Sequence, residues 1–204
     1  MGPARVIPPA RLYFLRHGET DWNAEGRLQG QQDIPLNSRG REQAARAGRT
    51  LRKLVAKARP DGAPPDFIAS PLGRTRETME IARSAMDLDP AAYAIDPRLK
   101  ELSFGTWEGL TWPDVQGLSP TLASGREADK WSFVPPAGES YAMLAERITP
   151  WLHELTRDTV VVSHGGVARV LMAIIGGLPI ERAPMVEIWQ DRPVIFANGR
   201  FDWV

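Results

Sequence analysis

Short apolar runs separated by longer amphipathic segments are the dominant pattern in the chain. The runs have the length and the apolar content of strands that are buried in a sheet. They lie at residues 11–16, 66–69 and 159–163, with a shorter candidate at 93–96. Three further strands are expected near the end of the chain, at residues 185–190, 193–197 and 200–203. The last two flank Asn198-Gly199, a pair that is typical of a tight hairpin.

Between the strands, apolar residues recur at helical spacing. The clearest case is residues 38–58, where Ser38 can cap the first turn. Ser70 and Pro71 fit the cap and the first position of a helix that continues to about Met86. Further helices are expected at residues 139–156 and 167–175. Strands that alternate with helices predict a three-layer α/β fold, with a mostly parallel central sheet covered by helices on both faces.

Two segments lack this periodicity. Residues 1–10 are rich in proline and are expected to form a flexible N-terminal tail, so that residues 11–204 make a single domain. Residues 98–138 are rich in tryptophan, glycine and proline, and we expect them to form a small irregular cap over the carboxyl edge of the sheet. Trp131 and Phe133 are the expected pocket walls in this cap, although packing explains most large side chains in so small a unit.

Composition narrows the classes of function. The 204 residues carry 25 basic and 25 acidic side chains, which gives a formal net charge of zero. This balance argues against a protein that coats nucleic acid or a membrane surface. The absence of cysteine excludes disulfides, thiolate nucleophiles and metals held by cysteine. No apolar run is long enough for a transmembrane helix and the first residues lack a signal-peptide core, so we expect a cytoplasmic protein.

Basic side chains follow three of the predicted strands. Arg16 and His17 end the first strand. Arg74 lies in the first helical turn after the second strand, and His164 follows the third, next to Gly165-Gly166. If these strands are parallel, their carboxyl ends meet at one edge, where arginines and helix N-termini favour a phosphoryl group. A neutral imidazole can attack phosphorus there, and a carboxylic acid can protonate the leaving alkoxide.

A set of motifs in a fixed order resembles the histidine phosphatase superfamily, in its phosphoglycerate mutase-like branch. The motifs lie at residues 16–23, 26–40, 70–78, 101–109, 138–140 and 163–166. The motif at 101–109 is most similar to α-ribazole phosphatases and broad-specificity phosphatases. The resemblance implies the fold described above and a reaction that passes through a phosphorylated histidine.

The resemblance also implies a role for each matching residue. His17 would be the phosphorylated nucleophile and Glu101 the proton donor, while Glu19 and Glu108 stay open as alternative donors. The residues implied to hold the phosphoryl group or the leaving group are Arg16, Asn23, Gln29, Gly30, Arg74, His164 and Gly165. No metal and no organic cofactor are implied, because arginines supply the positive charge that a magnesium ion supplies elsewhere.

The predicted function is hydrolysis of a phosphomonoester, as in a histidine acid-type phosphatase. A phosphoglycerate mutase and a non-catalytic phosphate-binding protein stay open as alternatives, and the intact set of site residues disfavours the second. After Glu101 the chain reads Leu102-Ser103-Phe104-Gly105, where the mutases that it resembles carry Arg-His-Tyr-Gly, and this favours hydrolysis. The expected partner is a small phosphate ester, with no nucleic acid and no membrane; a homodimer stays open.

Overall fold

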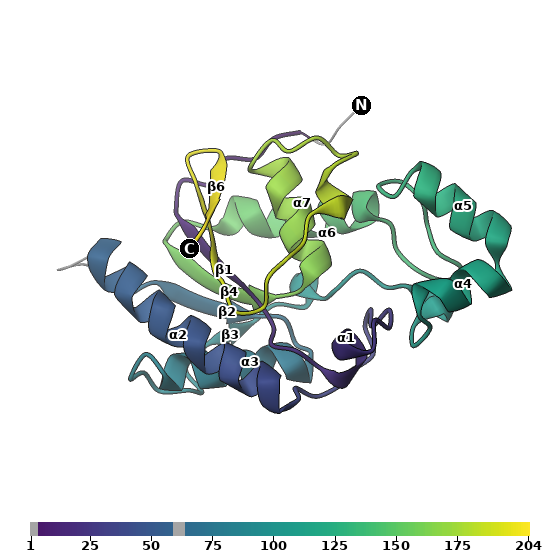
Figure 1. Ribbon diagram of the computed structural model, residues 1–204. Helices are drawn as coiled ribbons and strands as arrows, with labels where there is room; N and C mark the ends of the chain where they lie inside the picture. Colours follow the sequence, from purple (N-terminus) through teal and green to yellow (C-terminus); the bar gives the residue numbers. More distant parts are fainter. Residues whose placement is uncertain (1–3, 59–63) are drawn as a thin grey trace.

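The central sheet of the computed structural model has six strands in the order β3-β2-β4-β1-β5-β6 (Figure 1). Residues 4–58 and 64–204 are described; the start of the expected tail and most of the break expected after the first long helix lie outside them. The strands are β1 Leu12–Arg16, β2 Asp66–Ala69, β3 Ala94–Ile95, β4 Thr159–Ser163, β5 Val194–Ala197 and β6 Arg200–Trp203. The first four are parallel to one another, and β5 and β6 are antiparallel, so the predicted mostly parallel sheet is confirmed.

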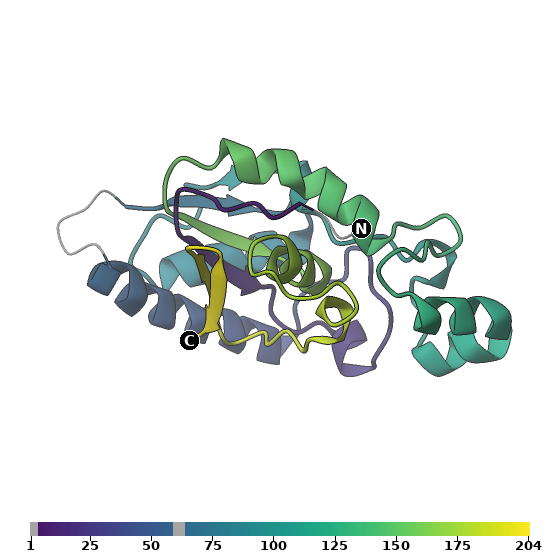
Figure 2. The same ribbon diagram turned by 90° about the horizontal axis from the view of Figure 1, so that it is seen from above.

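Helices cover both faces of this sheet, as Figure 2 shows. The α-helices are α1 Asp21–Ala24, α2 Ser38–Ala58, α3 Gly73–Ser84, α4 Trp112–Leu118, α5 Pro120–Ala128, α6 Tyr141–Glu154 and α7 Gly165–Ile174. Short 3₁₀ helices are η1 Pro97–Leu99, η2 Gly105–Trp107 and η3 Ala183–Met185. Alternate residues of β1 explain the layers: Leu12 and Phe14 pack in the core of α6 and α7, whereas Tyr13 and Leu15 pack in the core of α2 and α3.

The parallel register brings the carboxyl ends of β1, β2 and β4 side by side. Arg16 of β1 lies beside Ser163 of β4, and the N–H of His17 donates to the Ser163 carbonyl at 2.9 Å. The N–H of Ser70, just after β2, donates to the Val162 carbonyl at 3.0 Å. The segments that follow β1, β2 and β4 therefore leave the sheet together at its carboxyl edge.

The segment 98–138 is more regular than we expected. It contains α4 and α5, which form a helical hairpin that stands apart from the sheet on the side of α1 (Figure 1). Thr111 and Asp114 form a capping box at the start of α4, and Pro120 opens α5. A small core of its own, with Trp107, Val115 and Ala123 buried, holds the hairpin together. That this unit acts as a cap stays a prediction.

One helix start and one predicted strand differ from the prediction, because the groups concerned bind side chains from other parts of the chain. The helix after β2 begins at Gly73 rather than at Ser70, whose hydroxyl bonds a histidine ring. Residues 185–190 form no strand, since η3 ends at Met185 and the carbonyls of Val186 and Ile188 accept hydrogen bonds from arginines.

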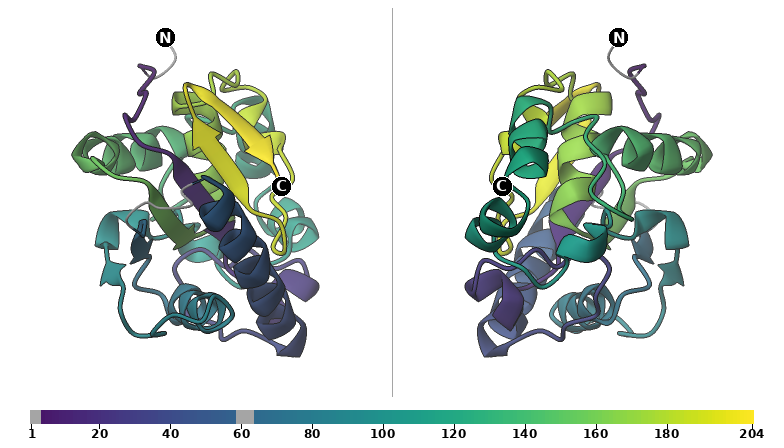
Figure 3. Two further views of the ribbon diagram at one scale, coloured as in Figure 1. Left: turned by 90° about the vertical axis from the view of Figure 1, so that its left-hand side faces the viewer. Right: turned by 90° about the vertical axis from the view of Figure 1, so that its right-hand side faces the viewer.

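The start of α2 differs from the sequence prediction, and the C-terminal hairpin agrees with it. The N–H of Gly40 donates to the side chain of Asn37 at 2.9 Å, so Asn37 rather than Ser38 caps this turn. The hairpin of β5 and β6 turns at Asn198 and Gly199 as predicted, with φ values of 53° and 70°. Figure 3 shows this hairpin beside β1.

The described part of the N-terminal tail binds the body of the protein. The N–H of Val6 donates to the Ile174 carbonyl at 2.8 Å, and the Val6 side chain is buried. Arg5 donates to the carbonyls of Ile175 and Gly199 at 3.1 and 2.8 Å. Residues 4–10 thus lack helix and strand, and Arg5 and Val6 anchor them to the domain, whereas we expected a flexible tail. Across the described residues, no helix is long and apolar enough to cross a membrane.

Candidate functional site

Two buried histidines form the centre of the carboxyl edge. His17 follows β1 and His164 follows β4, and their rings lie edge to face with centroids 5.2 Å apart. The side chains of both are almost fully enclosed. The predicted meeting of these two residues is therefore a consequence of the β1–β4 pairing.

The ring of His17 is fixed in one tautomer. Its Nδ1 lies 2.8 Å from the carbonyl oxygen of Gly18, which can only accept, so Nδ1 carries the proton and donates. The lone pair is then on Nε2, which accepts from Nε of Arg74 at 3.3 Å. Burial, followed by the charges of Arg74 and Arg16, holds the pKa of His17 well below its usual value of 6.5. The hydrogen bond to the Gly18 carbonyl raises the pKa of His17, but by less than burial and the two arginines lower it.

Arg74 is held by main-chain carbonyls of the loop after α1. Its Nη1 donates to the Gln32 carbonyl at 2.6 Å and its Nη2 to the Gly30 carbonyl at 2.7 Å. Gly30 has a φ of +53°, and a Cβ at this position would overlap the carboxylate of Glu108. Burial lowers the pKa of Arg74 to about 10, so the enclosed guanidinium is short of compensating charge.

Three buried nitrogen atoms of the site have no hydrogen-bond partner among the described residues. They are Nε of Arg16, Nδ1 of His164 and Nε2 of Gln29. Arg16 donates from Nη1 to the Ile188 carbonyl at 2.9 Å, and His164 Nε2 lies 2.8 Å from the hydroxyl of Ser70. Because unpaired buried polar groups are costly, the site suits a small oxyanion that would accept from them.

Burial also acts on the titration of these groups. Together with the positive charge of Arg169, burial lowers the pKa of Arg16 to about 10. The pKa of His164 is held well below 6.5 by burial and then by the charge of Arg74. The site therefore combines two neutral imidazoles with two buried arginines, and the ion pair of Arg74 with the half-exposed Asp33 is long, at 3.9 Å.

Asn23, Gln29 and Gly165 surround this centre in different ways. The carbonyl oxygen of the Gln29 side chain accepts from the hydroxyl of Thr20 at 3.1 Å and from the Asn23 amide at 3.3 Å. The side-chain oxygen of Asn23 accepts from the Gln190 amide at 3.0 Å, so Asn23 links Gln190 to Gln29. A Cβ built on Gly165 would lie 3.6 Å from Nε of Arg16, which places the start of α7 against that guanidinium.

Of the three candidate carboxylates, Glu101 alone is bound to the start of α7. Its two oxygens accept from the N–H groups of Gly166 at 3.1 Å and Leu102 at 3.0 Å. Its negative charge also raises the pKa values of both Arg16 and Arg74 against the effect of burial.

The other two carboxylates have different partners. Glu19 accepts from Asn37 at 3.1 Å and pairs with Arg39 at 3.4 Å, on the side of α2. Glu108 accepts from Ser103 and from the N–H groups of Gln31 and Phe104, all within 3.1 Å. Both carboxylates are therefore bound to the loops around the centre, and Glu108 in addition raises the pKa of Arg74.

Several residues that support the site were missed by the sequence analysis. The hydroxyl of Thr78 accepts from the N–H of Gly18 at 3.0 Å and donates to the Arg74 carbonyl at 2.7 Å. Arg147 of α6 pairs with Glu139 at 2.7 Å and donates to the Lys100 carbonyl at 3.1 Å, next to Glu101. Thr78 and Glu139 belong to the matched motifs, but nothing in the sequence indicated which groups they would bind.

Three further observations concern Arg27, metal ligands and Phe133. Arg27 pairs with Glu25 at 2.5 Å and donates to the Gly109 carbonyl at 2.8 Å, so its contacts are structural. Within the described residues, no three His, Asp or Glu side chains gather as ligands for a metal ion. Phe133 stacks on Trp107, with ring centroids 5.7 Å apart, in the small core of the α4–α5 hairpin.

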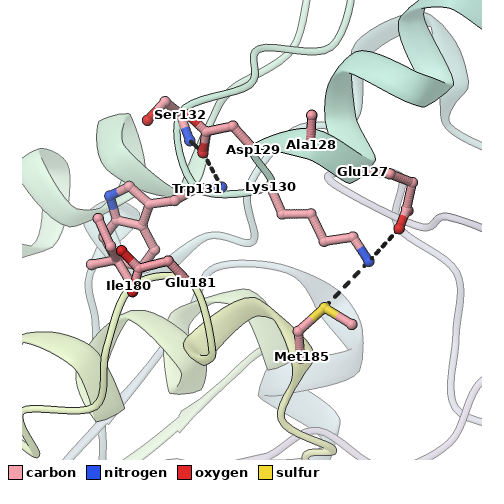
Figure 4. A pocket seen from close by; sticks show the side chains of 9 residues that line it. All are labelled: Glu127, Ala128, Asp129, Lys130, Trp131, Ser132, Ile180, Glu181 and Met185. Carbon is pink, nitrogen blue, oxygen red and sulfur yellow. Dashed lines mark hydrogen bonds and ion pairs between the residues drawn. The ribbon is translucent and has the colours of Figure 1, made fainter.

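A cavity of about 400 Å³ lies away from the histidines, between the end of α5 and the turn after α7 (Figure 4). Trp131 and Ile180 both line it, and the ammonium group of Lys130 lies between the carboxylate of Glu127 and the sulfur of Met185. Trp131 is thus a wall of this cavity, and none of the predicted site residues takes part in lining it.

Comparison with known proteins agrees with this geometry. The family model of the histidine phosphatase superfamily (branch 1) matches residues 12–193, which is most of the chain. A glucosyl-3-phosphoglycerate phosphatase of Mycolicibacterium vanbaalenii is 34% identical, over 95% of this chain and 82% of the relative. A protein of Enterobacter sp. (strain 638) named a probable phosphoglycerate mutase, GpmB, is 37% identical over 83% of this chain and 76% of that protein.

A solved structure is also similar to this chain over almost its whole length. The α-ribazole phosphatase from Shigella flexneri superposes with a TM-score of 0.76 and 26% sequence identity, over 95% of this chain and 94% of that chain. The similarity extends over both layers of helices and the sheet, so it covers the whole fold rather than one motif.

Proposed function

The chain belongs to the histidine phosphatase superfamily (branch 1), and we propose that it hydrolyses phosphomonoesters through a phosphohistidine formed on His17. The observation that carries this proposal is the fixed tautomer of His17. Its Nδ1 proton is committed to the Gly18 carbonyl, so Nε2 is the nucleophilic atom. Similarity to two phosphatases supports hydrolysis as the reaction.

In the first step, the lone pair of His17 Nε2 attacks the phosphorus atom. The bond from phosphorus to the ester oxygen breaks, and its electron pair goes to the leaving oxygen, which takes a proton from Glu101. The phosphoryl oxygens accept from Nε of Arg16, from Arg74 and from Nδ1 of His164. Ser70 would assist by donating its hydroxyl to Nε2 of His164, which leaves the ring proton on Nδ1.

In the second step, Glu101 acts as the base. It takes a proton from water, the resulting hydroxide attacks phosphorus, and the bond from phosphorus to Nε2 breaks with its electron pair returning to the imidazole. Phosphate and the starting enzyme are released. The arginines stabilise negative charge in both steps, because they are already fixed in place and need no reorganisation.

The finer class of histidine acid-type phosphatase is part of this proposal. Its physical basis is the low pKa of His17, which keeps the nucleophile neutral in mildly acidic solution. The substrate is a small phosphate ester, and no metal or organic cofactor takes part.

The test is to trap the intermediate. Rapid quench with a ³²P-labelled ester should give about one label per chain that survives alkali and is lost in acid, as expected for a phosphorylated imidazole. His17→Ala should give no label. His153→Ala is the matched control, because His153 is exposed on α6, and it should label fully. Absence of label in the native protein, or full label in His17→Ala, would contradict the proposal.

A second assay separates hydrolysis from mutase transfer, which the similarity to a protein named as a mutase keeps open. With 3-phosphoglycerate as substrate and 2,3-bisphosphoglycerate as primer, we expect phosphate release to exceed formation of 2-phosphoglycerate. Isomerisation much faster than phosphate release would replace the hydrolase assignment with the mutase.

A further inference from the structure

A buried cation outside the phosphoryl site has few partners in the protein. Arg83 lies in the last turn of α3, and only 5% of its surface is exposed. Its Nε donates to the carbonyl of Asp89 at 2.7 Å, and its guanidinium carbon lies 4.2 Å from the ring centre of Phe67. Its Nη1 is buried and has no hydrogen-bond partner among the described residues. Because an unpaired buried donor is costly, this nitrogen is suited to an acceptor that a ligand supplies.

Arg83 lines a cavity of about 580 Å³ at the amino ends of β2 and β3. Asp66 lines the cavity as well, and the other lining residues are apolar or aromatic; they include Phe67, Leu88 and Tyr93. An apolar space of this size with a few polar groups is typical of a site for a small organic molecule. The cavity lies at the opposite end of the strands from the two histidines, and none of the predicted site residues lines it.

The carboxylates close to Arg83 are bound to other groups. Asp89 accepts from the N–H of Ala91 at 2.9 Å. Asp66 pairs with Arg157 at 3.2 Å, and both side chains are about half exposed, so that solvent screens them. Burial lowers the pKa of Arg83, and the charge of Asp89 raises it by less. The enclosed guanidinium is therefore short of negative charge.

We propose that this cavity binds a small carboxylic acid with an apolar body, in the form of its carboxylate anion. The carboxylate pairs with the guanidinium of Arg83, since a guanidinium matches the two oxygens of a carboxylate, and the apolar body lies against Leu88 and Tyr93. One guanidinium balances one negative charge, whereas a phosphate dianion would leave a charge without a partner near Asp66. The site is separate from the phosphoryl centre and does not depend on the proposed phosphatase function.

The experiment is a calorimetric titration of the native protein with three probes. 3-Phenylpropionate carries both features, 3-phenylpropan-1-ol lacks the charge, and acetate lacks the apolar body. We expect the acid to bind about tenfold or more tightly than the alcohol, as for one charge-assisted hydrogen bond, and about tenfold or more tightly than acetate because of the buried ring. All titrations are repeated in excess inorganic phosphate, which is expected to occupy the phosphoryl centre and to leave the affinity for 3-phenylpropionate unchanged.

Variants locate the binding. Arg83→Gln should weaken binding of 3-phenylpropionate by about tenfold or more and abolish the preference for the acid over the alcohol. Arg49→Gln is the matched control, because Arg49 is exposed on α2 and does not line the cavity, and its affinity should equal that of the native protein. Ala92→Trp keeps Arg83 but places a large side chain at the exposed rim of the cavity, so it should block binding even if Arg83→Gln does not fold.

Each outcome decides the proposal. Binding of 3-phenylpropionate that is lost in Ala92→Trp and Arg83→Gln and retained in Arg49→Gln supports it. No heat of binding with the acid in millimolar excess, equal affinity for the acid and the alcohol, or native affinity in Ala92→Trp would each refute it. Displacement of the acid by inorganic phosphate would assign the binding to the phosphoryl centre and would refute it too. Hydrolysis of p-nitrophenyl phosphate, measured in parallel, reports the proposed function alone and should be unchanged in Ala92→Trp.

Discussion

Substitution of Gly166 by alanine should impair the proposed proton donor, Glu101, while leaving the residues that bind the phosphoryl group in place. A Cβ at this position of α7 would overlap Oε1 of Glu101 and Cδ2 of Leu102. Both atoms end flexible side chains, so the fold should adapt at a cost of about 1–3 kcal/mol for overpacking. About 0.4–1 kcal/mol of this cost is offset because alanine restricts the unfolded chain more than glycine does.

The effect on catalysis should be larger than the effect on stability. The Glu101 carboxylate must move away from the N–H of Gly166, which it accepts from at 3.1 Å. A displacement of about 1 Å commonly costs about 10²-fold in rate, and general acid catalysis contributes about 10²- to 10⁴-fold. We therefore expect kcat/KM for an alkyl phosphate to fall by about 10²-fold.

An aryl phosphate provides the internal comparison. Nitrophenolate leaves without a proton, so kcat/KM for p-nitrophenyl phosphate, which reports the phosphorylation step, should fall much less than that for glycerol 3-phosphate. Gly117→Ala is the matched control, because a Cβ there meets open space, and both esters should react normally. An equal loss for both esters in Gly166→Ala would refute the role of Glu101 as proton donor.

Four further predictions concern charge and protonation. Arg74→Ala should lower kcat/KM by about 10²-fold or more, as for loss of one fixed oxyanion donor, and near-normal activity would remove Arg74 from the phosphoryl site. For p-nitrophenyl phosphate, the pH profile of kcat/KM, which reports the free enzyme, should lack an acidic limb near pH 6.5, because the pKa of His17 is held well below that value; a tenfold fall per pH unit below 6.5 would contradict this. Stability should decrease as pH falls below about 6.5, since the unfolded chain then binds protons that buried His17 and His164 do not, and urea titrations at pH 7.5 and 5.5 measure this difference. Activity should persist in EDTA, and loss of activity that an added divalent metal restores would refute the metal-free mechanism.

The strands and most helices could be predicted because their patterns are local. The β-branched run at residues 159–163 and the helical spacing of residues 38–58 need no distant partner to be interpreted. The predicted helix start at Ser70 was wrong because of a contact that is not local. Serine before proline is a good helix cap, yet its hydroxyl bonds His164, which lies 94 residues later in the chain. A contact at that separation leaves no local pattern.

The same reasoning applies to the site. Arg16, His17, Arg74 and His164 could be predicted to converge, because each follows a strand or starts a helix of a parallel sheet. The competing carboxylates could not be separated in this way. Glu19, Glu101 and Glu108 all lie in matched motifs, and only the partners of each side chain distinguish them.

The arginines of the site are tethered by neutral groups, and this has a functional consequence. Arg16 donates to the carbonyl of Ile188, and Arg74 donates to those of Gln32 and Gly30. A carboxylate would hold a guanidinium as firmly, but it would also neutralise the charge and compete with the phosphoryl group.

Carbonyl oxygens fix the geometry without cancelling the charge, and the cost appears as the lowered pKa values of both arginines. The nearest carboxylate that pairs with Arg74 is Asp33, at 3.9 Å and half exposed, where solvent screens it. A chain with a formal net charge of zero can therefore present an uncompensated positive centre at one edge of its sheet. Binding of a phosphate ester supplies the missing counter-charge, so the energy spent on burying the arginines is recovered where charge develops in the transition state.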